Sequence, residues 1–578
     1  MLWWGNRPSV YAQADTQYLQ ASGVVSRYEI LQPDNTFLNS VIQSCTPMQH
    51  CDQTQVMSTT GAQASIGPLP QWTSTYVVDP DYRAYRWMLA DDDAAGAYSF
   101  HYRDQATGYP LSIVNHPYVT IADWPYADSV ASQNPNTWGK DLLPQCSGCG
   151  TGGYSVSNPN VFDIAHHPSI ADVSYIVTGS YYYLEELQYT ASFIELWQNP
   201  AYRDYASGTL YTGIPQTRGK AWSLRSIGDA AYITPDADPL KAYFNTMIVN
   251  AVSDLNARFT NNASANPFGI IESGYPYTVN GIANSGVATW QNSFATWAAG
   301  HLADMGIPGA AALRDWMSKF NISLMTDWEN NQAGGYCWLL ASTYVLQVKT
   351  ATGAFLPSFT SLYQTNFPSL YGLACNSSAM VSALGTLEGG TYQAGEMVGY
   401  PNSPTGFPAN FQIGLAAAAD SNYPNAQQAW QIFQGRSVQP NYSDDPNFAV
   451  LPRYLPAVPI VSIYASPNPV AAAGNTTTLY WNASNATSCS AAWASNGATS
   501  GQVSVGPITA TTSFPISCAG PNGSTKAIAS VSIGSSPTTS TPPPATSTPA
   551  PATGGGAMDW LGLLLLGGLV GWSRIRRR

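Results

Sequence analysis

Two adjacent histidines, His166 and His167, stand out in a chain of 578 residues that contains only six histidines. A neutral imidazole can accept a proton at physiological pH, so either residue could act as a general base. Arg218 and Arg225 lie seven positions apart, about two helical turns, and could therefore face one cleft. Together with Tyr181 as a proton donor, these residue types would suit elimination next to a uronate carboxylate. The alternative is structural: a histidine that caps a helix and arginines that tie loops to backbone carbonyls.

Hydrolysis of a glycosidic bond would instead need two carboxylates roughly 5–10 Å apart. Glu272 and Glu396 lie in glycine-containing segments and are candidates, but the sequence does not match either of them with a partner. For substrate contacts we single out Trp290, Gln291 and Tyr400, because an indole face can stack on a sugar ring. The alternative for Trp290 is a place in the hydrophobic core.

Motifs for other chemistries are missing from the sequence. It contains no phosphate-binding loop, no dinucleotide fingerprint and no zinc-protease motif. Asp91, Asp92 and Asp93 do not have the spacing of a calcium-binding loop. We therefore expect neither a cofactor nor a metal ion.

The histidine and arginine candidates lie in a region, 159–456, that is predicted to be mostly helical. Apolar residues recur with the helical period, and loops rich in Gly, Pro, Asn or Asp separate the repeats. The predicted helices cover residues 177–197, 216–231, 239–259, 290–305, 310–320, 336–348, 411–419 and 425–435. Phrases such as TGSYYYLEELQYTASF and WQNSFATWAAGHLADMG resemble those of the six-hairpin glycosidases and polysaccharide lyases. The resemblance implies an (α/α) toroid that acts on a polysaccharide, as a lyase or as a glycoside hydrolase.

Residues 1–158 have a different pattern. The segments 74–78, 85–89, 97–103 and 118–121 alternate or run as strands between turn sequences. We predict an all-β domain that packs against the toroid. Because the first residues do not form a signal peptide, we also expect this domain to lack its true N-terminus.

A separate module is predicted at residues 457–534. Short alternating runs at intervals of about ten residues, separated by Gly, Asn and Pro, favour a β-sandwich. The strings TTLYWNASNATSC and TTSFPISC resemble bacterial immunoglobulin-like repeats. This resemblance implies a disulfide between Cys489 and Cys518 in a module that serves as a spacer or as a weak glycan binder.

The cysteines are even in number and fall into local pairs, which is typical of an oxidising compartment. The pairs are Cys45 with Cys51, Cys146 with Cys149, Cys337 with Cys375, and Cys489 with Cys518. Spacing alone does not fix the connectivity, and Cys146 and Cys149 could also form half of a zinc site. We favour structural disulfides because no second half of such a site follows.

The C-terminal residues form two further segments. A Pro/Thr/Ser linker at 535–553 precedes a tail at 554–578, which begins with three glycines and continues with an apolar run and an arginine cluster. The tail resembles the glycine-glycine sorting signal of Gram-negative bacteria, which a rhomboid-type protease (rhombosortase) cleaves. The resemblance implies a single transmembrane segment that anchors the chain transiently in the inner membrane, before release to the cell surface or the exterior.

The composition agrees with export and excludes several classes. Charged residues make up 10% of the chain, against about 25% in ordinary soluble domains. With 22 basic and 34 acidic residues the net charge is −12, so the basic clusters of a nucleic-acid binder are absent. We therefore expect an exported carbohydrate-active enzyme with a polysaccharide as its partner. The alternative is a surface protein that binds glycans or another cell without catalysis.

Overall fold

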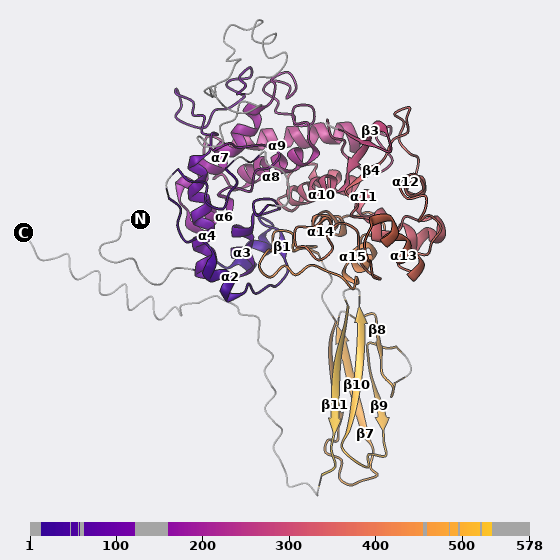
Figure 1. Cartoon of the computed structure of the whole chain (residues 1–578). Coiled ribbons are helices and arrows are strands. Elements are labelled where there is room, and N and C mark those ends of the chain that lie inside the picture. The colour runs from indigo at the N-terminus through magenta and orange to yellow at the C-terminus, as the bar shows by residue number, and fades with distance from the viewer. Residues whose placement is uncertain are drawn as a thin grey trace, which may run out of the picture. The chain divides into compact units, whose positions relative to one another are not determined.

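The computed structural model describes residues 13–46, 48–55, 57, 63–121, 160–274, 276–454, 459–484, 486–494, 497–520 and 523–534. The chain divides between Pro456 and Ala457 into two compact units, and each is described by itself (Figure 1). The linker at 535–553 and the tail at 554–578 lie outside the described residues.

The described part of the N-terminal region is helical, which corrects the prediction of an all-β domain. Its elements are α1 (Thr16–Ser22), β1 (Arg27–Tyr28), α2 (Asn35–Ser40), α3 (Gln71–Val78), α4 (Tyr82–Asp93) and the 3₁₀ helix η1 (Ala94–Ala97). The segment 74–78 lies in α3, where Trp72 to Val77 are all buried, so burial on every side outweighs its strand-like composition. In α4 the Asp81 side chain accepts a hydrogen bond from the backbone N–H of Arg83 and caps the helix.

The rest of the first unit combines helices with small sheets, and this mixture replaces the predicted (α/α) toroid. Its helices are α6 (Asp172–Thr178), α7 (Tyr181–Trp197), α8 (Thr217–Ile233), α9 (Lys241–Leu255), the π-helical turn η2 (Asn256–Thr260), α10 (Thr289–Asp304), α11 (Ala310–Asn331), η3 (Gln332–Gly334), η4 (Trp338–Leu340), α12 (Phe359–Asn366), α13 (Ser378–Glu388), α14 (Phe407–Ala419) and α15 (Ala426–Gln434). Strands β2 (Tyr277–Val279), β3 (Ile282–Ala288) and β4 (Val345–Gln347) form an antiparallel sheet in that order. Residues 336–348, predicted as a helix, instead form η4 and β4, because β4 finds hydrogen-bonding partners on β3.

Helix α10 lies at the centre of this unit, in contact with α8, α11 and α14. Most of its residues are buried, and small side chains let its neighbours approach closely. A Cβ added at Gly300 would lie 2.7 Å from the Cβ of Ala417 on α14, and one at Gly228 on α8 would lie 2.2 Å from the side chain of Leu302. Glycine therefore sets the spacing of these helices.

The two ends of the first unit are held together. Strand β1 pairs antiparallel with β5 (Val450–Leu451). Beyond β5, the Arg453 guanidinium donates to the backbone carbonyls of Gln20 and Val25 and pairs with Asp304 at 2.8 Å. This single side chain thus connects α1, the start of β1 and the end of α10.

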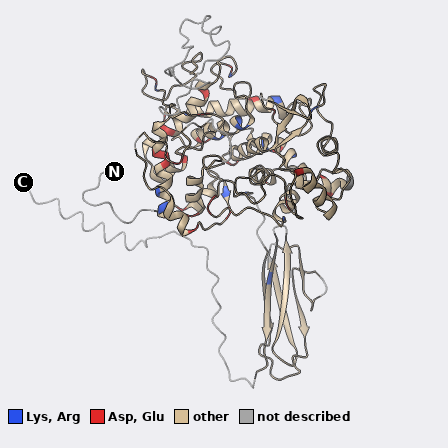
Figure 2. Cartoon of the chain, in the orientation of Figure 1, with Lys and Arg blue, Asp and Glu red and all other residues tan. Residues whose placement is uncertain are grey.

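In the second unit, the described residues form six strands: β6 (Ile460–Ser466), β7 (Thr477–Ser484), β8 (Ser488–Ser490), β9 (Ser500–Val505), β10 (Thr512–Gly520) and β11 (Gly523–Val531). They form two antiparallel sheets, ordered β6-β7-β9 and β11-β10-β8. Leu479 and Val531 belong to one apolar cluster between them, and Trp481 and Ile516 to another. Figure 2 shows how few charged residues lie in the strands of this unit.

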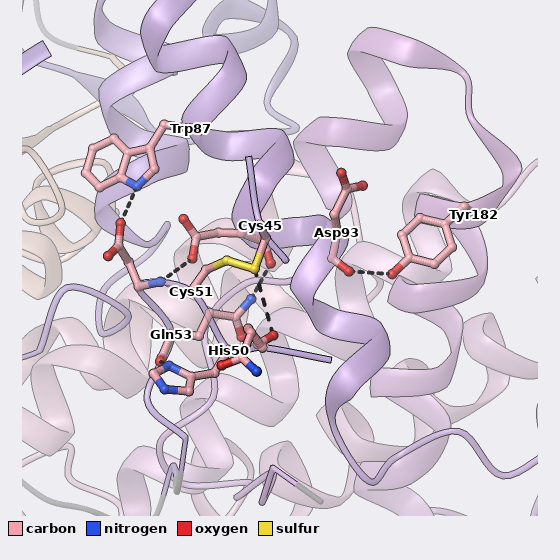
Figure 3. Close-up of a disulfide and its surroundings, with 10 residues drawn as sticks. Cys45, His50, Cys51, Gln53, Trp87, Asp93 and Tyr182 are labelled. Carbon is pink, nitrogen blue, oxygen red and sulfur yellow. Dashed lines mark hydrogen bonds between the residues drawn. A yellow bond between two sulfur atoms is a disulfide. The ribbon is translucent and has the colours of Figure 1, made fainter. Parts of the chain in front are cut away.

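Three disulfides are present among the described residues: Cys45–Cys51, Cys337–Cys375 and Cys489–Cys518. Cys146 and Cys149 lie outside that part of the chain. Figure 3 shows the first bond and the loop that it closes, which docks onto α4. There the N–H of Asp52 donates to the Asp91 carboxylate at 2.9 Å, and the Trp87 indole donates to the carboxylate of Asp52 at 2.7 Å. The presence of three disulfides points to an extracellular or periplasmic location.

No helix in the described ranges is both long and apolar enough to cross a bilayer. The single transmembrane segment of the predicted fold is therefore not found there, and the apolar run assigned to it lies outside those ranges.

Candidate functional site

A cleft of about 810 Å³ opens in the first unit, and aromatic rings make up much of its wall. The aromatic lining residues are Trp222, Tyr277, Trp290, Phe294, Tyr344, Tyr400, Phe407 and Phe448. Its polar lining consists mainly of amide and hydroxyl side chains, namely Gln63, Gln216, Ser273, Thr278, Gln291, Thr405 and Asn410. Such a mixture of apolar surface and a few polar groups is typical of a small-molecule or glycan site.

The cleft lies where three helices begin. Helix α8 starts at Thr217 and places Arg218 in its first turn, α10 starts at Thr289 and places Trp290 and Gln291 there, and α14 starts at Phe407. Within this group Gln291 joins the elements: its amide oxygen accepts from the N–H of Arg218 at 3.2 Å, and its amide nitrogen donates to the hydroxyl of Tyr277 at 3.1 Å. The position of β2 is thereby tied to the starts of α8 and α10.

The aromatic rings form a continuous row. Trp290 stacks on Tyr344 with ring centroids 6.1 Å apart, Tyr344 contacts Phe407 at 5.2 Å, and Phe407 contacts Tyr400 at 6.2 Å. Tyr344 is 47% exposed and Tyr400 is 73% exposed, so both rings are accessible from solvent. Tyr400 also has a φ of 64°, a left-handed conformation that is uncommon for a bulky residue.

Arg218 brings the positive charge to this cleft. Its Nε donates to the Gln216 side chain at 2.7 Å, and its guanidinium lies over the Trp290 ring at 5.4 Å from the centroid. Neither of its terminal nitrogens has a hydrogen-bond partner among the described residues. Partial burial lowers the pKa of Arg218, while the negative charge of Asp163 opposes that shift.

The structure places His167 and Arg225 in the interior, away from the cleft lining. The ring of His167 bonds the Ile164 carbonyl at 3.0 Å and the hydroxyl of Ser226 at 2.9 Å. Burial and the nearby Arg225 lower the pKa of His167 well below its usual value, so the imidazole is neutral. Arg225 itself donates to the carbonyls of Gly67 and His167, both at 3.0 Å. Arg225 thus binds loop carbonyls, as in the structural alternative, whereas His167 bonds Ser226 in the middle of α8 instead of capping a helix.

His166 and the other acid–base candidates also lie outside the lining. His166 is buried and its Nδ1 lies 2.5 Å from the Asp163 carboxylate. Tyr181 is exposed at the start of α7, and Glu272 forms an ion pair with Lys349. Glu396 accepts a hydrogen bond from the N–H of Gln393 in a turn. The structure thus brings together Arg218, Trp290, Gln291 and Tyr400, but not these side chains.

Among the lining residues that were not singled out from the sequence, Tyr277, Tyr344 and Phe407 contact the predicted ones directly. A signal existed for two of them. Asn280-Gly281 is a favoured hairpin turn and would have indicated the strand that carries Tyr277. Gly406-Phe407-Pro408 places a proline in a first helical turn and so marks the start of α14.

Metal binding has no support in the described part of the chain, where no group of three or more His, Cys, Asp or Glu side chains could hold an ion. Comparisons with protein-family models, with curated proteins and with solved structures found no match to this chain.

Proposed function

We propose that this chain is an exported glycan-binding protein whose cleft holds a segment of a polysaccharide. The observation that carries the proposal is the row of Trp290, Tyr344, Phe407 and Tyr400, with two exposed rings beside uncharged amides and hydroxyls. Sugar rings present C–H groups on their faces and hydroxyls at their edges. Aromatic faces and polar side chains complement these two features.

Binding has more support than bond cleavage, for a chemical reason. Among the described residues that line the cleft, none is a carboxylate or a histidine. Hydrolysis would need two carboxylates near the sugar, and the candidates Glu272 and Glu396 already interact elsewhere. Tyr277 could serve as a base only when ionised, and burial raises its pKa to about 12.

The disulfides support an extracellular or periplasmic setting for such a protein. We extend the proposal to the cell surface of a Gram-negative bacterium, with the tail at 554–578 as the sorting signal for a rhomboid-type protease. The support for this extension is the glycine-rich, apolar and arginine-rich sequence of the tail.

The proposal is tested by titrating soluble oligosaccharides of several linkages into the purified protein and following tryptophan fluorescence. Tyr400→Ala should weaken binding by roughly 3- to 10-fold, the amount expected for loss of one aromatic stacking contact. Tyr18→Ala is the matched control, because Tyr18 is also highly exposed, at 68%, and does not line the cleft.

Two results would contradict the proposal. One is the absence of binding to every glycan in a broad panel. The other is equal binding by wild type, Tyr400→Ala and Tyr344→Ala, which would place the ligand elsewhere. An ultraviolet-absorbing unsaturated product, or new reducing ends, would show that the protein cleaves its ligand instead of only holding it.

A further inference from the structure

The three helices that begin at the cleft have the same arrangement at their N-caps. In α8, α10 and α14 the N-cap side chain accepts no hydrogen bond from the first turn, although in α8 the Gln291 side chain accepts one from the N–H of Arg218. Each helix start carries a partial positive charge equivalent to roughly half an elementary charge. Each helix is also long, with 17, 16 and 13 residues respectively. Each of these helix ends therefore contributes a positive partial charge beside the cleft.

Arg218 adds a full charge at the same place. It is the sole ionised side chain among the described residues that line the cleft. Its two terminal nitrogens have no hydrogen-bond partner among the described residues, although the Gln216 amide fixes the Nε side of the guanidinium. A planar guanidinium held in this way presents two parallel N–H donors, the geometry that binds an oxyanion through two hydrogen bonds.

The protein offers little to neutralise this charge. Asp163 is the carboxylate that acts on Arg218 electrostatically, but its oxygen lies 2.5 Å from the ring of His166 and it does not line the cleft. By contrast, Arg225 has both terminal nitrogens bonded to backbone carbonyls in the interior. Of these two arginines, only Arg218 is free to bind a ligand.

We propose that the saccharide held in the cleft is acidic, and that its oxyanion group, a uronate carboxylate or a sulfate ester, binds to Arg218 beside the starts of α8, α10 and α14. This inference rests on the proposed glycan-binding function and specifies the class of ligand. Stacking on the aromatic row would position the sugar ring, while the cation would select for charge.

The test compares matched ligands by isothermal titration calorimetry with the full chain. The probes are an oligogalacturonate, the same oligosaccharide after reduction of its carboxyl groups to alcohols, and a sulfated galactan oligosaccharide. The wild type should bind at least one charged probe roughly 10- to 100-fold more tightly than the neutral probe, the usual range for a hydrogen bond to a charged group. That preference should shrink as sodium chloride rises. Preference for one charged probe over the other then identifies the source of the oxyanion.

Variants locate the effect. Arg218→Gln should remove the preference for charge, so that this variant binds the charged and the neutral probes with affinities within about 3-fold of each other. Arg218→Lys should retain part of the preference, because lysine keeps the charge and loses the two-pronged geometry. Arg258→Gln is the control, since Arg258 pairs with Asp254 on the surface outside the cleft. Equal affinity for the neutral and both charged probes in the wild type would overturn the inference and leave the glycan-binding function intact. Binding of none of these or any other saccharide would instead overturn the proposed function.

Discussion

Asp92, near the end of α4, is a carboxyl group with no access to solvent. The hydroxyl of Ser174 donates to it at 2.5 Å and the N–H of Ala171 at 3.2 Å. Burial nevertheless raises its pKa to about 8, and the same cause raises the pKa of the buried Glu195 to about 8. Both groups are therefore largely protonated in the folded protein at neutral pH and ionised in the unfolded chain.

A pH dependence of stability follows from these two carboxyl groups. Because their folded pKa lies above the unfolded value, the stabilisation is complete below pH ~4 and is lost as pH rises toward about 8, by up to ~1.4 kcal/mol per pH unit for each group. We expect the free energy of unfolding of the first unit to decrease from pH 5 to pH 8. Urea denaturation in steps of about one pH unit measures this decrease.

Asp92→Asn should flatten this decrease, because a neutral amide does not titrate. Asp236→Asn is its control, since the Asp236 side chain is fully exposed. A slope that is identical in wild type and Asp92→Asn would exclude Asp92 as a source of the pH dependence.

The close packing of α10 against α14 leads to a prediction about the free energy of unfolding. Gly300 of α10 faces Ala417 of α14 so closely that an added Cβ would lie 2.7 Å from the Cβ of Ala417. Gly300→Ala should lower the free energy of unfolding by roughly 1–3 kcal/mol through overpacking, despite the better helix propensity of alanine.

The double variant Gly300→Ala/Ala417→Gly moves the methyl group from one helix to the other. It should recover much of the lost stability, apart from the ~1 kcal/mol cost of a glycine in α14. Chemical denaturation of both single variants and the double variant gives the coupling energy. Strictly additive effects would show that the two helices do not limit each other at this point.

A helix or strand can be predicted from the sequence when the residues that determine it lie close together in the chain. The helices predicted at 216–231 and 290–305 are confirmed as α8 and α10, because the 3.6-residue period of buried residues is a local signal. The segment 74–78, Ser-Thr-Tyr-Val-Val, has strand-forming residues but folds as part of α3, since it is buried on all sides. The strand predicted at 85–89 instead lies in α4, and the local signal missed there was Asp81, a helix cap directly after Pro80.

In the candidate site, too, the residue types can be predicted from the sequence, whereas their position relative to one another cannot. Trp290, Gln291 and Arg218 could be proposed from residue type, and all three line the cleft. Their meeting with Tyr400 could not be derived, because it requires α8, α10 and α14 to begin at one place, which is a tertiary property. The adjacent histidines were proposed as general bases because they are neighbours in the sequence. In the structure, His167 instead bonds the hydroxyl of Ser226 in α8.

At the scale of the whole molecule, the two units should unfold separately, because each has its own apolar core. The Cys489–Cys518 bond spans 29 positions in the second unit and Cys337–Cys375 spans 38 in the first. In the chain-entropy model each bond contributes roughly 3–4 kcal/mol.

Replacing Cys489 and Cys518 with alanine should therefore lower one calorimetric transition and leave the other in place. The matched pair, Cys337 and Cys375 to alanine, should lower the transition that the first pair leaves unchanged. If both pairs of substitutions shift the same transition, the units do not unfold independently.

The pairing of β1 with β5 also determines when, during synthesis, the first unit can complete its fold. Arg27 donates to the carbonyl of Pro452, 425 positions further along the chain, and Arg453 holds the carbonyls of Gln20 and Val25. During synthesis the N-terminal strand leaves the ribosome hundreds of residues before its partner exists. Synthesis at about 5–20 residues per second makes that interval tens of seconds long. The first unit therefore stays incomplete while most of its chain is being made, and a protein destined for export gains a period in which it is still unfolded enough to be threaded through a translocation channel.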